Sequence, residues 1–295
     1  PDNVTTTPDF IFVSDMFAAQ YAGGAELSLQ TIMETSPSKH VGAVNSELLN
    51  KEIVDQHKNL KWVFGNIANL KPEIIEYVMS SGIEYSFIEF DYKFCKHRNP
   101  VLYNMVEGEA CNYQETDKGK LLTKFANSAA SVFFMSENQM KIHQDCLPGL
   151  TKNNAHVLSS LFTQGFFDYV QEVKTKYKNK KKTKWLVMGS NSWVKGVQES
   201  KDWCEENGHE YEVVQGLSPE EFIDKLAQAK GLCFKPSGLD TCPRLVIEAK
   251  LLGCELSLNE NVQHKDEDWF TKEESDMKSY LLSRPEFFWE NAFEK

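Results

Sequence analysis

One segment of the chain reads Phe234-Lys-Pro-Ser-Gly-Leu-Asp-Thr-Cys-Pro-Arg-Leu-Val-Ile-Glu-Ala-Lys-Leu-Leu-Gly253. The apolar run at 231–234 predicts a buried strand, and the helical spacing of apolar residues predicts a helix over 243–252. Pro243 suits the first helical position because its missing N–H would be unpaired there, and Gly253 is a typical C-terminal stop. The segment therefore predicts a strand, a loop and a helix in succession.

Two acids lie in this predicted unit, Asp240 in the loop and Glu248 inside the helix. A helix N-terminus beside the carboxyl end of a strand favours anions, because its N–H groups are free and the helix dipole is positive there. The acids would then contact hydroxyl groups of the same ligand. The spacing alone fits equally well an ordinary strand–loop–helix unit whose acids are solvated.

The chain has 295 residues, of which 41% are hydrophobic and 12% aromatic, so it is long enough for two domains with buried cores. No run reaches the roughly 18 apolar residues of a membrane span. The first eight residues, 1–8, lack the basic and apolar regions of a signal peptide, although a removed leader is not excluded.

The number of cysteines and the net charge indicate the cellular compartment and exclude one class of partner. The seven cysteines form no Cys-x-x-Cys pair, which fits reduced thiols in a cytoplasmic protein better than a disulfide framework or a zinc site. A net charge of −11 argues against nucleic acid as a partner, since that binding depends on neutralising phosphates. We therefore expect a cytoplasmic protein that does not bind nucleic acid.

Strand and helix signals alternate along the whole chain, which predicts parallel sheets covered by helices. The strands of a first series are expected at 10–15, 41–44, 62–64, 85–90, 132–135 and 156–158, with a helix at 25–34. Those of a second series are expected at 185–188, 211–214 and 231–234, with helices at 197–206, 219–229 and 275–293. Ser218-Pro219-Glu220-Glu221 has the sequence of a capped helix start.

Between the two series, residues 174–184 contain seven lysines and no acid. A solvated linker is the ordinary interpretation, but a phosphate or membrane-surface patch, with peripheral membrane contact, is compatible with it. The predicted organisation is an N-terminal Rossmann-like domain at 1–173, this linker at 174–184, a second Rossmann-like domain at 185–274 and a helical stretch at 275–295. The fold class is α/β.

The segment from Asp240 to Gly253 resembles the donor-binding motif of the retaining glycosyltransferases of GT-B fold, the group 1 or family 4-like type. Their pattern has two acids separated by seven residues, then Ala and Gly, which Ala249 and Gly253 match. The resemblance implies a cleft between the two domains, a C-terminal helix that crosses back to the first, and an acceptor on the first domain's side. Asp240 replaces the usual Glu, and Pro243 stands where a Gly is common.

The resemblance also assigns roles to individual residues. Asp240 would contact hydroxyls of the transferred sugar, and Glu248 would contact the ribose of the nucleotide. Lys195, followed by Gly196, resembles the lysine that pairs with the donor diphosphate. The usual Arg five positions earlier is Ser190 here, and Arg244 is placed to replace it.

The first domain holds further candidates. Gly23 and Gly24 precede a predicted helix and would let the backbone approach a phosphate or sugar closely. The family carries a similar double glycine near the place where donor and acceptor meet. After the strand at 85–90, His97 and Asp91 are candidates for the acceptor side, although a loop His is often only hydrogen-bonded or solvated.

An acidic triplet at 266–268 is similar to the manganese site of the other glycosyltransferase fold, but an exposed helix start explains it better. No metal or other cofactor is expected. The resemblance therefore predicts a retaining, metal-independent glycosyltransferase in glycan biosynthesis. Its donor would be a nucleotide-sugar, and its acceptor a glycan, a lipid-linked molecule or a small molecule. A GT-B-type nucleotide-sugar epimerase and a non-catalytic nucleotide-sugar or glycan-binding protein remain alternatives. The sugar, base, acceptor and oligomeric state stay open.

Overall fold

The computed structural model describes residues 9–113, 115–147, 149–150 and 154–293. The stretch 1–8, considered above for a leader, lies outside the described residues. The described chain divides into two compact units. The first comprises residues 9–98, 110–161 and 283–293, and the second comprises residues 99–109 and 162–282.

The first unit is built on a six-stranded parallel sheet with the order β2-β1-β3-β4-β5-β6. Its strands are β1 Phe10–Ser14, β2 Val41–Asn45, β3 Lys61–Phe64, β4 Glu84–Glu89, β5 Ser131–Phe134 and β6 Ala155–Val157. Every residue of β1 is buried, as expected for a central parallel strand that is covered on both faces.

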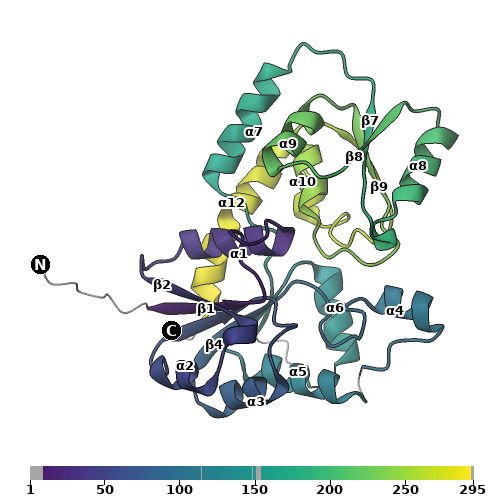
Figure 1. Cartoon of the computed structure of the whole chain (residues 1–295). Helices are drawn as coiled ribbons and strands as arrows, with labels where there is room; N and C mark the ends of the chain where they lie inside the picture. The colour runs from purple at the N-terminus through teal and green to yellow at the C-terminus, as the bar shows by residue number, and fades with distance from the viewer. Residues whose placement is uncertain (1–8, 114, 148, 151–153, 294–295) are drawn as a thin grey trace, which may run out of the picture. The chain divides into compact units, whose positions relative to one another are not determined.

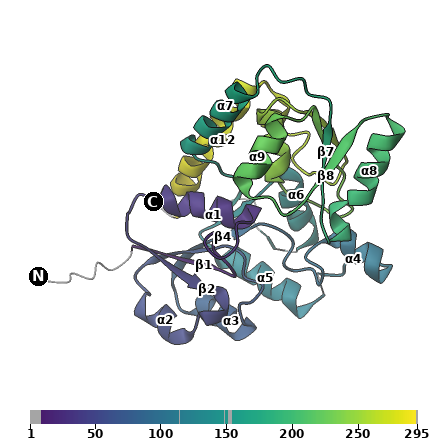
Figure 2. The same cartoon turned by 45° about the horizontal axis from the view of Figure 1, so that its top comes forward.

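Helices cover both faces of this sheet (Figures 1 and 2). They are α1 Gly24–Glu34, α2 Lys51–Gln56, α3 Pro72–Ser80, α5 Asp117–Ser128 and α6 Glu137–Cys146, with a short 3₁₀ turn at Ser46–Leu48. In both views α1 lies on one face, whereas α2, α3 and α5 lie on the other. This arrangement follows from right-handed crossovers, because the chain reverses direction across the sheet after β2.

The C-terminal helix α12, Glu274–Asn291, ends in the first unit, to which residues 283–293 belong. The indole of Trp289 packs on Phe10, with ring centroids 4.8 Å apart, and donates to the carbonyl of Ile32 at 3.2 Å. The hydroxyls of Ser86 and Ser131 donate to the carbonyls of Ala292 and Asn291. Residues 289–292 therefore complete the core of the first unit.

The second unit has a four-stranded parallel sheet with the order β10-β9-β7-β8. Its strands are β7 Trp185–Met188, β8 Tyr211–Val214, β9 Gly231–Phe234 and β10 Glu255–Leu258. Its helices are α4 Pro100–Glu107, α7 Gln164–Lys176, α8 Val197–Glu206, α9 Pro219–Ala227, α10 Arg244–Leu251 and α11 Asp268–Thr271. Figure 1 shows α8 on one face of the sheet and α9 with α10 on the other.

These units confirm the predicted α/β fold of two Rossmann-like parts with parallel sheets. Ser218 and Glu221 form the predicted capping box at the start of α9. The prediction for Pro243 is wrong by one position. Its ψ of 120° is extended, so Pro243 is the N-cap residue and α10 begins at Arg244.

Lysine-rich residues 174–184 cover the end of α7 and the connection to β7, and they lie within the second unit. No helix in the described part of the chain combines the length and the apolar character that a membrane span needs.

Candidate functional site

Two of the predicted site residues, 45 positions apart in the sequence, meet in the second unit. The Nζ atom of Lys195 lies 3.2 Å from Oδ2 of Asp240, with side chains 47% and 19% exposed. Lys195 ends the 3₁₀ turn Trp193–Lys195 after β7, and Asp240 follows β9. Because β7 and β9 are neighbours in a parallel sheet, their carboxyl ends bring the two loops together.

Gly196 is what allows the Lys195 loop to approach the strand end so closely. Its φ is +66°, and a Cβ atom at this position would lie 1.7 Å from the carbonyl oxygen of Lys235. Only glycine avoids both this clash and the strain of the left-handed conformation. The amide of Ser237 donates to the carbonyl of Val194 at 2.7 Å, which fixes the two loops against each other.

The backbone of Asp240 is held on both sides by a short parallel bridge to Val262. Its amide donates to the carbonyl of Asn261 at 2.8 Å, and its carbonyl accepts from the amide of Gln263 at 3.0 Å. The side-chain amide of Asn261 in turn donates to the carbonyl of Pro236 at 2.8 Å. The acid therefore lies on a fixed loop rather than on a free one.

Arg244 and Glu248 lie one turn apart on α10, and each offsets the charge of the other. Burial raises the pKa of Glu248, and Arg244 lowers it by a smaller amount. Burial lowers the pKa of Arg244, while Glu248 opposes that shift. The guanidinium of Arg244 also lies 4.0 Å from the ring centroid of Phe162, a cation–π contact. Arg244 is therefore already engaged, and its predicted contact with phosphate stays a prediction.

A residue that sequence reasoning missed, Asn99, holds the loop next to Asp240. Its Oδ1 atom accepts from the amide of Leu239 at 3.2 Å, and its Nδ2 atom donates to the carbonyl of Leu239 at 2.9 Å. Oδ1 also caps α4 through the amide of Leu102 at 3.3 Å. Asn99 is 8% exposed, and a Cβ atom on Gly238 would come within 2.8 Å of its Nδ2. In the sequence, Asn99 followed by Pro100 indicates only a helix start, and it does not identify Leu239 as a partner.

The predicted glycines of the first unit lie where α1 begins. Gly23 is the N-cap residue and Gly24 the first helical residue, and no side chain caps the helix. A Cβ atom on Gly23 would lie 2.5 Å from Oε2 of Glu26, whose pKa burial raises. His97 is partly exposed in the loop after β4, and it lies in the first unit with the two glycines.

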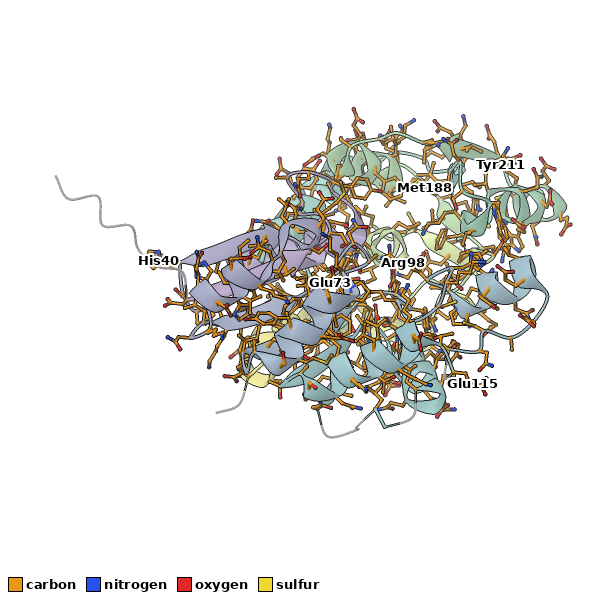
Figure 3. All side chains as sticks on the ribbon, turned by 60° about the horizontal axis from the view of Figure 1, so that its bottom comes forward. His40, Glu73, Arg98, Glu115, Met188 and Tyr211 are labelled. Atoms are coloured by element: carbon orange, nitrogen blue, oxygen red, sulfur yellow. The ribbon has the colours of Figure 1, made fainter. Side chains whose placement is uncertain are left out.

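The loop after β4 contains a buried ionic network that sequence reasoning only partly identified. Lys93 Nζ lies 2.5 Å from Oε1 of Glu89 and 3.1 Å from Oδ1 of Asp91, and the Lys93 side chain is 2% exposed. Arg98, labelled in Figure 3, pairs with the other Asp91 oxygen at 2.5 Å and has a left-handed φ of +55°. Asp91, a candidate for acceptor contacts, is thus bound by two cations of its own loop.

Charges within the network shift the pKa values of its members in opposite directions. Burial acts to raise the pKa of Glu89, but Lys93 and His143 outweigh it and hold that pKa below its ordinary value. Burial acts to lower the pKa of Lys93, but Asp91 and Glu89 raise it overall. Glu89 and Lys93 therefore remain an ion pair inside the core.

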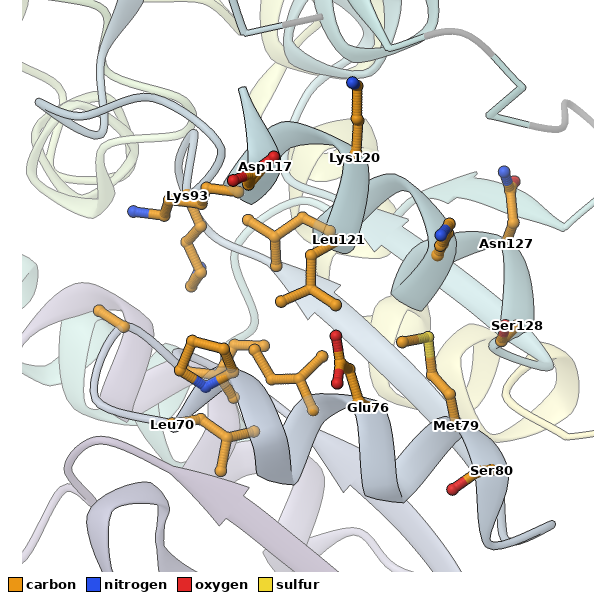
Figure 4. Close-up of a pocket in the computed structure, with 17 residues that line it drawn as sticks. Leu70, Glu76, Met79, Ser80, Lys93, Asp117, Lys120, Leu121, Asn127 and Ser128 are labelled. Carbon is orange, nitrogen blue, oxygen red and sulfur yellow. The ribbon is translucent and has the colours of Figure 1, made fainter. Parts of the chain in front are cut away.

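A cavity of about 1240 Å³ lies between α3 and α5 of the first unit, and none of the site residues predicted from the sequence lines it. In Figure 4, Glu76 and Met79 of α3 and Leu121 of α5 point toward one another across it. Of the ionic network, only Lys93 lines this cavity.

The acidic triplet at 266–268 is committed to local contacts. Asp266 pairs with Lys265 at 3.0 Å, and Oε1 of Glu267 accepts from the indole of Trp269 at 3.0 Å. Among the described residues, no group of three or more His, Cys, Asp or Glu side chains is arranged to hold a metal ion. The triplet therefore shows no arrangement of a metal site.

Comparison with known proteins relates the chain to solved structures by fold rather than by sequence. No protein-family profile and no curated protein sequence matches it. A UDP-forming α,α-trehalose-phosphate synthase from Burkholderia xenovorans is 7% identical, with a TM-score of 0.59 over 97% of this chain and 99% of that chain. HepE from Anabaena, solved in complex with UDP, is 10% identical, with a TM-score of 0.57 over 96% of this chain and 91% of that chain. HepE solved with UDP-glucose has a TM-score of 0.55 at 10% identity and the same coverage. The protein therefore has the GT-B fold, built from two Rossmann-like units.

Proposed function

We propose that the protein is a glycosyltransferase that transfers a sugar from a UDP-sugar to an acceptor, with retention of configuration and without a metal ion. The observation that carries this proposal is the 3.2 Å approach of Lys195 to Asp240 at the carboxyl ends of β7 and β9. In a nucleotide-sugar the diphosphate is bonded directly to the sugar, so a cation for phosphate and an acid for sugar hydroxyls must be neighbours. The nature of the base is suggested by HepE, solved with UDP and with UDP-glucose.

In this proposal the second unit binds the donor through residues with distinct tasks. Lys195 contacts the diphosphate together with the N–H groups at the start of α10, where the helix dipole favours an anion. Glu248 holds the ribose, and Asp240 holds hydroxyls of the sugar. As the bond to the diphosphate breaks, negative charge grows on phosphate, and the fixed ammonium of Lys195 stabilises it. Gly23, Gly24 and His97 remain candidates for contacts in the first unit.

The test is to incubate the protein with a panel of nucleotide-sugars, with and without EDTA, and to measure release of the nucleoside diphosphate. We expect UDP release from one UDP-sugar, insensitive to the chelator, and an α-linked product from an α-linked donor. Complete loss with EDTA and rescue by manganese would contradict a metal-independent site. Tight binding of the donor without release would indicate a binding protein, and a changed sugar on the recovered nucleotide would indicate an epimerase.

Replacing Lys195 by Ala should weaken UDP affinity about tenfold or more, because a hydrogen bond to a charged group contributes about 1.5–3 kcal/mol. The side chain is half exposed, so we expect the protein to remain folded. Isothermal titration calorimetry with UDP measures the effect. Lys272→Ala, an exposed lysine before α12, is the matched control. Equal affinity in a folded Lys195→Ala protein would remove Lys195 from the site.

Replacing Asn99 by Ala should raise the KM for the donor about tenfold, because the loop carrying Asp240 loses both hydrogen bonds to Leu239. Asn99→Asp keeps the acceptor for the Leu239 amide but cannot donate to its carbonyl, so its effect should be intermediate. Steady-state kinetics of both variants, beside thermal melting, separate loop positioning from loss of structure. A lower melting temperature with unchanged kinetics would assign Asn99 a purely structural role.

A further inference from the structure

Two cysteines of the first unit face each other at contact distance. The thiol of Cys111 donates to the sulfur of Cys95, with 3.2 Å between the two Sγ atoms. Both cysteines are present as thiols. A disulfide has an S–S distance of about 2.05 Å, so bond formation requires these sulfurs to approach further from 3.2 Å.

Cys95 and Cys111 lie on either side, in the sequence, of the segment that contains Asn99. Residues 99–109, with α4, belong to the second unit, whereas Cys95 and Cys111 both belong to the first. A bond between Cys95 and Cys111 would thus close a loop at its base. The segment inside that loop contains Asn99, the residue that holds the Asp240 loop.

Accessibility separates this pair from the other cysteines. Cys95 is buried, but Cys111 is partly exposed, so a small oxidant would approach the pair from the side of Cys111. Cys204 and Cys233 also lie close together, yet both are 0% exposed in the core between α8 and β9. Cys146 accepts a hydrogen bond from the hydroxyl of Tyr113 at 2.6 Å. Cys146, Cys204 and Cys233 therefore serve as internal controls for a reaction at Cys95 and Cys111.

We propose that Cys95 and Cys111 are a redox modification site, at which a peroxide forms a reversible disulfide that restrains residues 96–110. The Cys111 thiolate takes one oxygen from hydrogen peroxide, giving a sulfenic acid and releasing hydroxide. The Cys95 sulfur then displaces that hydroxyl as water and forms the S–S bond. In sum, two thiols and one hydrogen peroxide give one disulfide and two waters. The site does not depend on the proposed transferase activity.

The environment of the Cys111 thiol sets the rate of the first step. Burial, followed by the hydrogen bond to Cys95, raises the pKa of Cys111 to about 12. The thiolate that attacks peroxide is consequently scarce at neutral pH, so the first step is slow and needs an excess of peroxide. Once the sulfenic acid has formed, however, Cys95 is already in contact with it.

The experiment treats the full chain with hydrogen peroxide, blocks remaining thiols by alkylation, and maps tryptic peptides by mass spectrometry. We expect peptides 94–96 and 99–118 to appear as one species, 2 Da lighter than their sum, and dithiothreitol to separate them again. Cys204 and Cys233 should remain alkylated as single thiols. Cross-linking of Cys111 to Cys146, or oxidation of Cys111 to sulfinic acid without a cross-link, would overturn the proposal.

Hydrogen exchange of the same samples tests the restraint. Amides of residues 99–109 should exchange several-fold more slowly in the oxidised protein, because the loop has lost freedom at its base. Cys111→Ser should show no cross-link and no change with peroxide, whereas Cys204→Ala should behave like the unaltered protein. If Cys111→Ser fails to fold, the peptide map of the unaltered protein still decides the question. A cross-link without slower exchange would overturn the restraint.

Discussion

Replacing Asp240 by Asn should lower turnover at least about a hundredfold while leaving the affinity for UDP nearly unchanged. Contacts to the reacting sugar strengthen in the transition state, so their loss appears in kcat rather than in binding of the leaving nucleotide. The backbone of Asp240 is fixed by its bridge to Val262, which argues that Asn can take its place without movement of the loop. Single-turnover kinetics with the donor and calorimetry with UDP measure the two quantities separately.

Glu248→Gln is the comparison that makes this result specific. Glu248 should hold the ribose, so its replacement should weaken UDP itself as well as the intact donor. Arg244 is the group that lowers the pKa of the Glu248 carboxyl. Gln has nearly the same shape as Glu but carries no charge. If both variants lost UDP affinity equally, the division of tasks between sugar and ribose would be wrong even though the fold is not in question.

Replacing Lys93 by Met should reduce the free energy of unfolding of the first unit by about 3–5 kcal/mol, because it leaves Glu89 buried without its principal cation. Urea denaturation followed by tryptophan fluorescence, to which the buried Trp62 of this unit contributes, reports the loss. Lys118→Met, at an exposed lysine of α5, is the matched control and should change little. The double variant Lys93→Met/Glu89→Gln should recover part of the stability, since no uncompensated carboxylate remains.

The pH dependence of this loss has a definite sign. In the unaltered protein the pKa of Glu89 lies below its unfolded value, so its contribution to stability is present above about pH 4.3 and is lost as pH falls. Loss of Lys93 removes the largest charge that lowers the pKa of Glu89, so that pKa rises and less of the stability gained from an ionised Glu89 remains at neutral pH. The difference between variant and unaltered protein should therefore be smaller at pH 4 than at pH 7. An equal difference at both pH values would contradict the ion-pair explanation.

The architecture was predictable because several central strands are short, mostly apolar runs. β1 and β9 are buried along their whole length, and such runs keep their meaning without knowledge of the partners. The approach of Lys195 to Asp240 was implied for the same reason, since neighbouring parallel strands end at one edge. The start of α10 was misplaced by one residue because Pro243 fits both the N-cap and the first helical position.

What the sequence did not reveal depends on distant partners. Asn99 contacts Leu239 across 140 positions, and nothing near Asn99 identifies that residue. Lys93 resembles any loop lysine, and only the fold shows that Glu89 and Asp91 enclose its ammonium. Cys95 and Cys111 have a spacing that matches no common motif, so their contact also emerges only in three dimensions.

The discontinuous composition of the first unit has a consequence during synthesis on the ribosome. Trp289, Asn291 and Ala292 complete a core whose other members, including Phe10 and Ser86, are made much earlier. At about 5–20 residues per second, the stretch between residues 162 and 283 delays those last contacts by roughly 6–24 s. A nascent chain halted before α12 should consequently expose the sheet surface around Phe10 to chaperones, whereas synthesis through α12 allows Trp289 to cover it.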